Sequence, residues 1–251
     1  MNEQALKEFL YKMADDTLII GHRNSEWTGM GPILEEDIAF SSMAQDQIGQ
    51  SLALFTLLHQ LGEQEPDTVA FMRNANQFHN CILTELPNQE YDFSIVRHFL
   101  YTTSAALRWD ICTHSSYEPL AQLARKVKGE LRYHSLHART WIQQLGSATE
   151  ESISRLQRSL ELAMPYALGI FEESPFEKEL VAQHIFDGEK QLREKWISSI
   201  EEVLGKTRLV LPDLKVIQPV LGGRKGQHSE HLQPLLDEMS EVFRTEPGAE
   251  W

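Results

Sequence analysis

Cysteine is nearly absent from this sequence, and long apolar runs are missing altogether. The 251 residues include only two cysteines, Cys81 and Cys112, which excludes a disulfide scaffold or a thiolate metal cluster and suits a reducing compartment. The longest apolar stretch, residues 52–58, is interrupted by Thr56 and is far too short to cross a bilayer. Residues 1–8 lack the basic and apolar regions of a secretory signal. We therefore expect a cytoplasmic protein without a membrane partner.

Basic residues are scarce as well. The chain has 23 Lys and Arg against 37 Asp and Glu, a formal net charge of −14 at pH 7. An acidic surface of this kind repels a phosphate backbone, which excludes nucleic acid as a general partner. With 41% hydrophobic residues and a mean hydropathy of −0.36, the composition is that of an ordinary soluble globular protein.

The sequence is rich in helical periodicity. Apolar residues recur at spacings of three and four along residues 6–20 and again along residues 36–61, after a proline that suits the first position of a helix. Gly62 predicts the end of the second helix. Residues 21–31 are rich in glycine and polar side chains and predict a turn between the two helices.

Similar stripes, that is, apolar residues that recur at spacings of three and four and so share one helix face, predict helices over residues 95–113 and 119–145. Ser147 and Glu150 predict a capping box for a helix that is kinked or divided at Pro165. A serine, a proline and a glutamate within residues 174–177 predict the start of one more helix, which reaches about residue 204.

The fold class that follows is all-α. Two prolines within residues 207–226 predict an extended segment, followed by a last helix that ends near residue 244. We expect one domain over residues 1–251, with a core helical bundle at about 3–146 and additional helices and an extended tail at about 147–244.

Long helices in such a bundle can carry a di-iron centre. That site needs a Glu from each of two helices and a Glu-x-x-His motif from each of the other two, all pointing inward. The i, i+3 spacing places the carboxylate and the imidazole on one face of the helix. The inward stripes are therefore the places to search for ligands.

Several segments, in a fixed order and spacing, carry a family resemblance. They are Asp16 with Arg23, EWTG at 26–29, QDQIGQ at 45–50, DTVAF at 67–71, QFHN at 77–80, ELRYH at 130–134 and GGRKGQHSEHL at 222–232. Together they resemble the C-type subunits of bacterial ring-1,2-phenylacetyl-CoA epoxidases, multicomponent monooxygenases of aerobic phenylacetate breakdown, over roughly residues 13–239. The resemblance implies a ferritin-like fold and a complex with other epoxidase components. These include a catalytic subunit of similar fold that carries di-iron, and a reductase that supplies electrons from NADPH.

The resemblance also locates the six positions at which the catalytic relatives hold iron. In this sequence those positions hold Thr17, Gln47, Gln50, Thr102, Leu131 and His134. Neutral amides and hydroxyls are weak ligands, and no negative charge remains to offset iron. The resemblance therefore implies a structural subunit that binds no cofactor, contributes no catalytic residue and supports the catalytic subunit. Whether such a chain counts as an enzyme stays open, since it is part of an oxidoreductase.

Two metal interpretations remain beside this one. Glu130 lies four residues before His134 on a helix, so the pair could form a hydrogen bond or part of an atypical metal site. His228 and His231 could hold zinc, although no third ligand is identifiable, or could simply precede a helix with Ser229 near its cap. A metal-dependent enzyme built on these residues is one alternative function, and a helical scaffold of an unrelated complex is another.

The glycine-rich loop at residues 222–226 is the remaining candidate site. Arg224 and Lys225 lie among glycines and before a helix, so the loop could bind an anion such as a CoA phosphate or dock onto an acidic partner. We expect these two cations to be exposed and, with His228, to lie where the chain meets the catalytic subunit or its CoA thioester.

Overall fold

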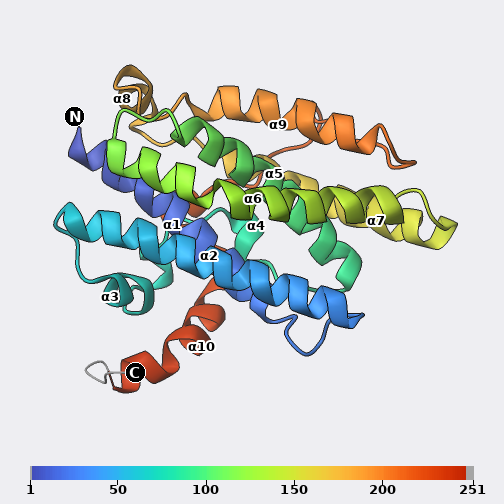
Figure 1. Ribbon diagram of the computed structural model, residues 1–251, viewed down its shortest axis with the longest axis horizontal. Helices are drawn as coiled ribbons and strands as arrows, with labels where there is room; N and C mark the ends of the chain where they lie inside the picture. The colour runs from blue at the N-terminus through green and yellow to red at the C-terminus, as the bar shows by residue number, and fades with distance from the viewer. Residues whose placement is uncertain (1, 247–251) are drawn as a thin grey trace. The chain divides into compact units, whose positions relative to one another are not determined.

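The computed structural model describes residues 2–246, and all regular secondary structure in the described chain is helical (Figure 1). No strand occurs among these residues, which confirms the all-α expectation and is consistent with a ferritin-like helical bundle. Three short 3₁₀ turns, at Ala75–Gln77, Gly169–Phe171 and Gly223–Lys225, accompany the α-helices. The α-helices are α1 (Glu3–Ser25), α2 (Leu34–Gln60), α3 (Pro66–Phe71), α4 (Ile82–Glu85), α5 (Tyr91–Cys112), α6 (Glu118–Leu145), α7 (Glu150–Leu168), α8 (Glu177–Ala182), α9 (Glu189–Leu204) and α10 (Leu232–Thr245).

The chain divides into two compact units. Unit 1 contains residues 1–87 and 222–251, and unit 2 contains residues 88–221. The division therefore does not fall near residue 146, where we expected the core bundle to end. The organisation of residues 1–251 as a single domain stays a prediction, and residues 1 and 247–251 lie outside the described part of the chain.

Unit 1 is framed by the antiparallel helices α1 and α2. The Ser51 hydroxyl donates to the Ala14 carbonyl at 3.0 Å, and the Asn24 amide donates to the Gln47 side-chain oxygen at 2.8 Å. Residues later in α2 therefore contact residues earlier in α1, so the two helices are antiparallel. The shorter α4 packs against α1, α3 packs against α2, and α10 packs against α3.

α1 is longer than its periodicity predicted, because Gly21 belongs to the helix and not to a turn. A Cβ atom at Gly21 would lie 3.1 Å from the Gln47 Cβ and 3.3 Å from the Ile48 side chain. The glycine therefore permits a close approach of α1 and α2. Sequence spacing cannot separate this use of glycine from a turn, since both require a missing side chain.

Unit 2 is framed by a second antiparallel pair, α5 and α6. The Lys128 ammonium lies 3.0 Å from the Asp110 carboxylate near one end of the pair, and the His98 and His137 rings lie 5.4 Å apart further along it. α7 and α9 pack against α5. The indole N–H of Trp196, on α9, donates to a backbone carbonyl of α5 at 2.9 Å.

Two details of unit 2 differ from the sequence predictions. The capping box of α7 is formed by Thr149 and Ser152, since the Thr149 hydroxyl accepts from the Ser152 N–H at 3.1 Å, and not by Ser147 and Glu150. The helix expected over 174–204 is two helices, α8 and α9. His184 and Gly188 break it, with φ of 55° and 102°, which are outside the helical region.

The predicted extended tail is confirmed. Residues 206–222 form no helix, and their backbone is fixed on unit 2 by hydrogen bonds. The Val220 N–H donates to the Pro165 carbonyl at 3.0 Å, and the Gln157 side chain bonds both the N–H and the carbonyl of Val210. Among the described residues, no helix is long and apolar enough to span a bilayer.

Candidate functional site

In unit 1, the degenerate ligand positions are buried. Thr17, Gln47 and Gln50 are each less than 5% exposed. The Thr17 hydroxyl donates to the Met13 carbonyl one turn earlier at 2.6 Å, and Gln47 accepts the Asn24 amide described above. Burial of Thr17 and Gln47 is offset by these hydrogen bonds within the unit, as expected for a polar layer in a helical core.

In unit 2, the equivalent positions are also buried. Thr102 and His134 are 1% exposed and Leu131 is 6% exposed. The Thr102 hydroxyl lies 3.2 Å from Nδ1 of His98, one turn before it on α5. Leu131 lines an apolar hollow on α6, as an aliphatic side chain should. Whether the unit 1 and unit 2 positions converge on one centre stays a prediction.

His98 is a residue that the sequence analysis missed. It is fully buried, and its ring meets the His137 ring edge-on at 5.4 Å. Burial lowers the pKa of His98 well below its usual value, and the nearby His137, His134 and Arg97 lower it further. The signal was available, because His98 stands four residues before Thr102 on the same helix face.

The residues at the six positions do not fit a di-iron centre. Their donor set is two amides, two hydroxyls, an aliphatic side chain and one imidazole, with no carboxylate to balance ferrous or ferric charge. Among the described residues, no group of three or more His, Cys, Asp or Glu is arranged to hold a metal ion. A site built around His134 and Glu130 therefore lacks further ligands of these types.

The glycine-rich loop is a packing element of unit 1. A Cβ atom at Gly223 would lie 2.3 Å from the Asn80 carbonyl oxygen, and one at Gly226 would lie 2.3 Å from the Asn76 carbonyl oxygen. Gly226 also has a φ of 73°, in the left-handed region. These glycines let the loop lie directly on residues 76–80, so a phosphate cradle is not needed to explain them.

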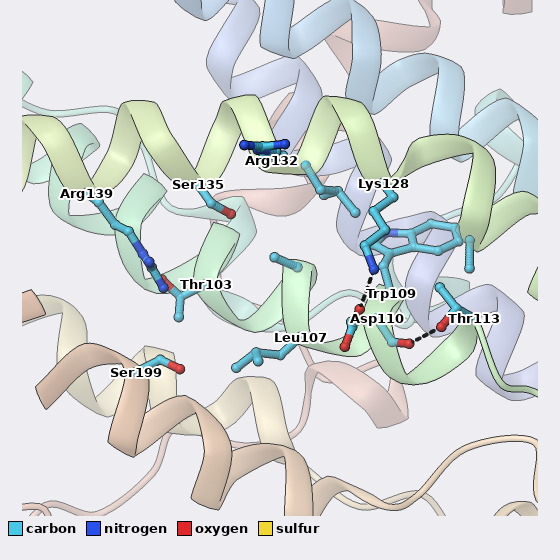
Figure 2. A pocket seen from close by; sticks show the side chains of 13 residues that line it. Thr103, Leu107, Trp109, Asp110, Thr113, Lys128, Arg132, Ser135, Arg139 and Ser199 are labelled. Carbon is cyan, nitrogen blue, oxygen red and sulfur yellow. Dashed lines mark hydrogen bonds and ion pairs between the residues drawn. The ribbon is translucent and has the colours of Figure 1, made fainter. Parts of the chain in front are cut away.

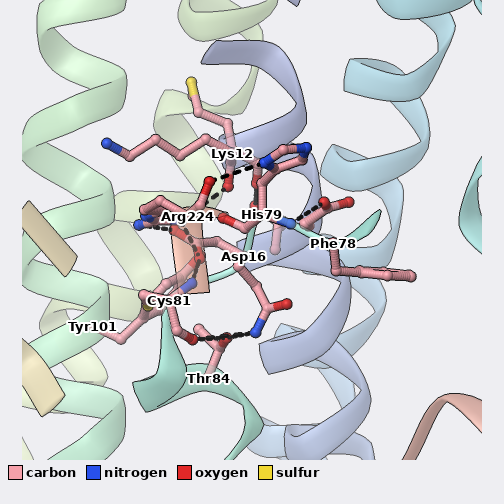
Figure 3. Close-up of polar contacts among 12 residues, drawn as sticks. Lys12, Asp16, Phe78, His79, Cys81, Thr84, Tyr101 and Arg224 are labelled. Atoms are coloured by element: carbon pink, nitrogen blue, oxygen red, sulfur yellow. Dashed lines mark hydrogen bonds and ion pairs between the residues drawn. The ribbon is translucent and has the colours of Figure 1, made fainter. Parts of the chain in front are cut away.

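Arg224 is buried, which contradicts the expectation of an exposed cation (Figure 3). Its side chain is 3% exposed, and its guanidinium donates to both carboxylate oxygens of Asp16 at 2.7 and 2.8 Å. It also donates to the His79 carbonyl at 2.8 Å, while the His79 ring donates back to the Arg224 carbonyl at 3.1 Å. Arg224 therefore joins the loop to α1 and to the segment before α4. Lys225, by contrast, is exposed.

His228 is also internal to unit 1. Nδ1 lies 2.8 Å from a Glu85 carboxylate oxygen, and Nε2 lies 3.0 Å from the Phe78 carbonyl. Both neighbours are oxygen atoms that accept hydrogen bonds, so the ring lies between two acceptors. Both ring nitrogens thus face protein oxygens in this structure, and the zinc alternative with His231 stays a prediction. The other Glu85 oxygen accepts the Ser229 N–H at 2.6 Å.

A second buried ion pair completes this network. Asp15, next to Asp16 on α1, pairs with Arg73, whose guanidinium donates to both its oxygens at 2.5 and 3.0 Å. Asp15 also accepts the His79 N–H at 2.8 Å, and the Arg73 guanidinium lies 4.0 Å from the centre of the Phe78 ring. The carboxylates of Asp15, Asp16 and Glu85 all accept hydrogen bonds from within unit 1, so the network has a structural role: it ties three segments of the unit together.

Neither cysteine is poised for reaction. Cys81 and Cys112 are free and buried. Burial raises the pKa of the Cys81 thiol and raises that of Cys112 to about 12. Because the thiolate is the reactive form, both thiols are inert near neutral pH.

Comparison with known proteins agrees with the resemblance drawn from the sequence segments. The family model described as phenylacetic acid catabolic protein matches residues 1–251. The chain is 29% identical over 247 residues to the C-type subunit of the 1,2-phenylacetyl-CoA epoxidase of Escherichia coli strain K12, an alignment that covers 98% of this chain and 99% of that protein. Since the family model spans the whole chain, this protein belongs to the phenylacetic acid catabolic protein family.

Proposed function

We propose that this chain is a structural, non-catalytic subunit of a multicomponent epoxidase that acts on phenylacetyl-CoA in aerobic phenylacetate catabolism. The relative in Escherichia coli is named as a subunit of a phenylacetyl-CoA epoxidase. The observation that carries the non-catalytic role is the chemistry of the buried ligand positions, where Thr17, Gln47 and Thr102 stand in place of anionic ligands.

The proposed partner is a catalytic subunit of similar fold that holds the di-iron site. That subunit would activate O2 with electrons that a separate reductase takes from NADPH, in the cytoplasm, while this chain binds neither cofactor. The buried networks around Asp15, Asp16 and Glu85 support this role, because they hold unit 1 rigid without offering an accessible reactive group.

A surface suited to a partner lies on α2. Leu34, Ile38, Ile48 and Leu52 are between 43% and 69% exposed and fall on one face of the helix. A Cβ atom at Gly49, on the same face, would meet nothing within 4 Å. The four side chains form two exposed apolar patches, with the exposed Gln45 between them, and a face that mixes apolar and polar groups in this way suits an interface with another protein. We assign it to the catalytic subunit, because the relative belongs to a multisubunit enzyme.

Of the three residues proposed to contact the partner or a CoA thioester, one remains a candidate. Arg224 and His228 are committed to Asp16 and Glu85 inside unit 1. Lys225 is exposed beside them. In the proposed complex Lys225 is therefore the cation that faces the partner or its substrate, and the two buried residues hold the loop that carries it.

The proposal is tested by reconstitution with a di-iron relative. Epoxidation of phenylacetyl-CoA should need both chains, and this chain alone should be inactive. The Ile38→Glu, Leu52→Glu double variant should weaken association by at least about tenfold, because it places two charges in an apolar interface. Leu162→Glu is the matched control, since Leu162 is 49% exposed on α7. Full activity of the di-iron relative without this chain would refute the proposal.

A further inference from the structure

A hollow opens among three helices of unit 2, namely α5, α6 and α9 (Figure 2). Its volume is about 290 Å³, near the lower end of the range of small-molecule sites. Its floor is apolar: Trp109, Ala124 and Leu131 are each less than 7% exposed, and Ala106 and Leu107 add to the wall. All of these residues belong to one unit, so the hollow is formed by unit 2 alone.

One rim of the hollow carries positive charge. Arg132, Ser135 and Arg139 follow one another at i, i+3 and i+7 on α6, and all three line the hollow. Among the described residues, neither arginine forms an ion pair within 4 Å, although Arg139 is close enough to Glu202 to help lower the pKa of that carboxyl. Lys128 on the same rim pairs with Asp110 at 3.0 Å. In a chain of net charge −14, two such guanidinium groups above an apolar floor are an uncommon combination.

We propose that this hollow binds a small amphipathic carboxylate, with its apolar body on Trp109 and Leu131 and its carboxylate held by Arg132 and Arg139. Guanidinium groups match the planar geometry of a carboxylate and bind it with two parallel hydrogen bonds. Ser135 and Ser199, on facing helices, add hydroxyl donors at the same rim. The volume accepts one aryl ring or a short acyl chain and excludes an intact coenzyme thioester. This inference does not depend on the proposed function.

Binding is measured on the full chain by titration calorimetry and ligand-observed NMR. The probes are phenylacetate and octanoate, with 2-phenylethanol and inorganic phosphate as controls. The alcohol keeps the apolar body and lacks the charge, whereas phosphate keeps the charge and lacks the apolar body. We expect saturable binding of both carboxylates, and at least about tenfold weaker binding of each control, which corresponds to about 1.4 kcal/mol.

Two variants locate the site. Arg132→Gln, Arg139→Gln should weaken phenylacetate binding at least about tenfold and leave the fold intact, because both side chains are exposed. Ala106→Phe should abolish binding by filling the hollow. Arg155→Gln is the control, an exposed arginine on α7 that pairs with Glu151. Failure of both carboxylates to saturate, equal binding of 2-phenylethanol or phosphate, or unchanged binding by the double glutamine variant overturns the proposal.

Discussion

Replacing Arg224 should destabilise the protein far more than replacing its neighbour Lys225. Arg224→Met removes two hydrogen bonds to Asp16 and one to the His79 carbonyl, all at 2.7–2.8 Å. It leaves a carboxylate whose side chain is 5% exposed, which still accepts the backbone N–H of Cys81 at 2.7 Å but has lost its counter-charge. Breaking a buried pair from one side costs about 3–5 kcal/mol, because the remaining charge stays desolvated.

The assay is urea unfolding followed by circular dichroism at neutral pH. Lys225→Ala serves as the exposed control and should change the free energy of unfolding by no more than about 0.5 kcal/mol. The double variant Asp16→Asn, Arg224→Met should recover part of the loss, since it removes the stranded charge. If Arg224→Met unfolds at the same urea concentration as Lys225→Ala, the buried network does not hold unit 1 together.

Three further results are expected. Elemental analysis after aerobic purification without chelator should find far less than one iron per chain, and two irons would refute the structural-subunit proposal. Because the pKa of His98 is lowered well below 6.5 in the folded protein, its contribution to stability should fall by up to about 1.4 kcal/mol per pH unit as the pH drops below about 6.5. Denaturant titrations at pH 7.5 and 5.5 should show a smaller loss for His98→Gln, and an equal loss would contradict the assignment. Restoring carboxylates with Gln47→Glu, Leu131→Glu should lower the melting temperature in metal-free buffer, because each change buries a charge at a cost of several kcal/mol; a variant that melts no lower than wild type would refute it.

The local rules of the sequence predicted most of the helices correctly. Periodicity located the long helices, and the two prolines located the extended tail, because both features depend on neighbours a few residues away. The same rules mistook Gly21 for a turn and missed the break at Gly188. Gly21 is required because α2 packs closely against it, and Gly188 adopts a positive φ that its neighbours in sequence do not dictate.

The charged loop was the larger error, for a related reason. Arg224 was expected to be exposed, and His228 was expected where the chain meets the catalytic subunit or its CoA thioester, yet both side chains are buried within unit 1. Their partners, Asp16 and Glu85, lie 208 and 143 positions away in sequence. A pattern within ten residues carries no information about such distant partners. The degenerate ligand positions, in contrast, are buried as the inward stripes predicted, because burial follows from the helix period alone.

The division of the chain also constrains the order in which it can fold during synthesis. Unit 2 is one continuous stretch, residues 88–221, and its contacts are complete once that stretch has left the ribosome. Unit 1 needs residues 222–246 beside residues 2–87, and the pairing of Asp16 with Arg224 closes a loop of 208 positions. Until that loop closes, Asp16 lacks Arg224 and Glu85 lacks His228 and Ser229, so we expect unit 1 to be the slower to mature and the more exposed to chaperones and proteases.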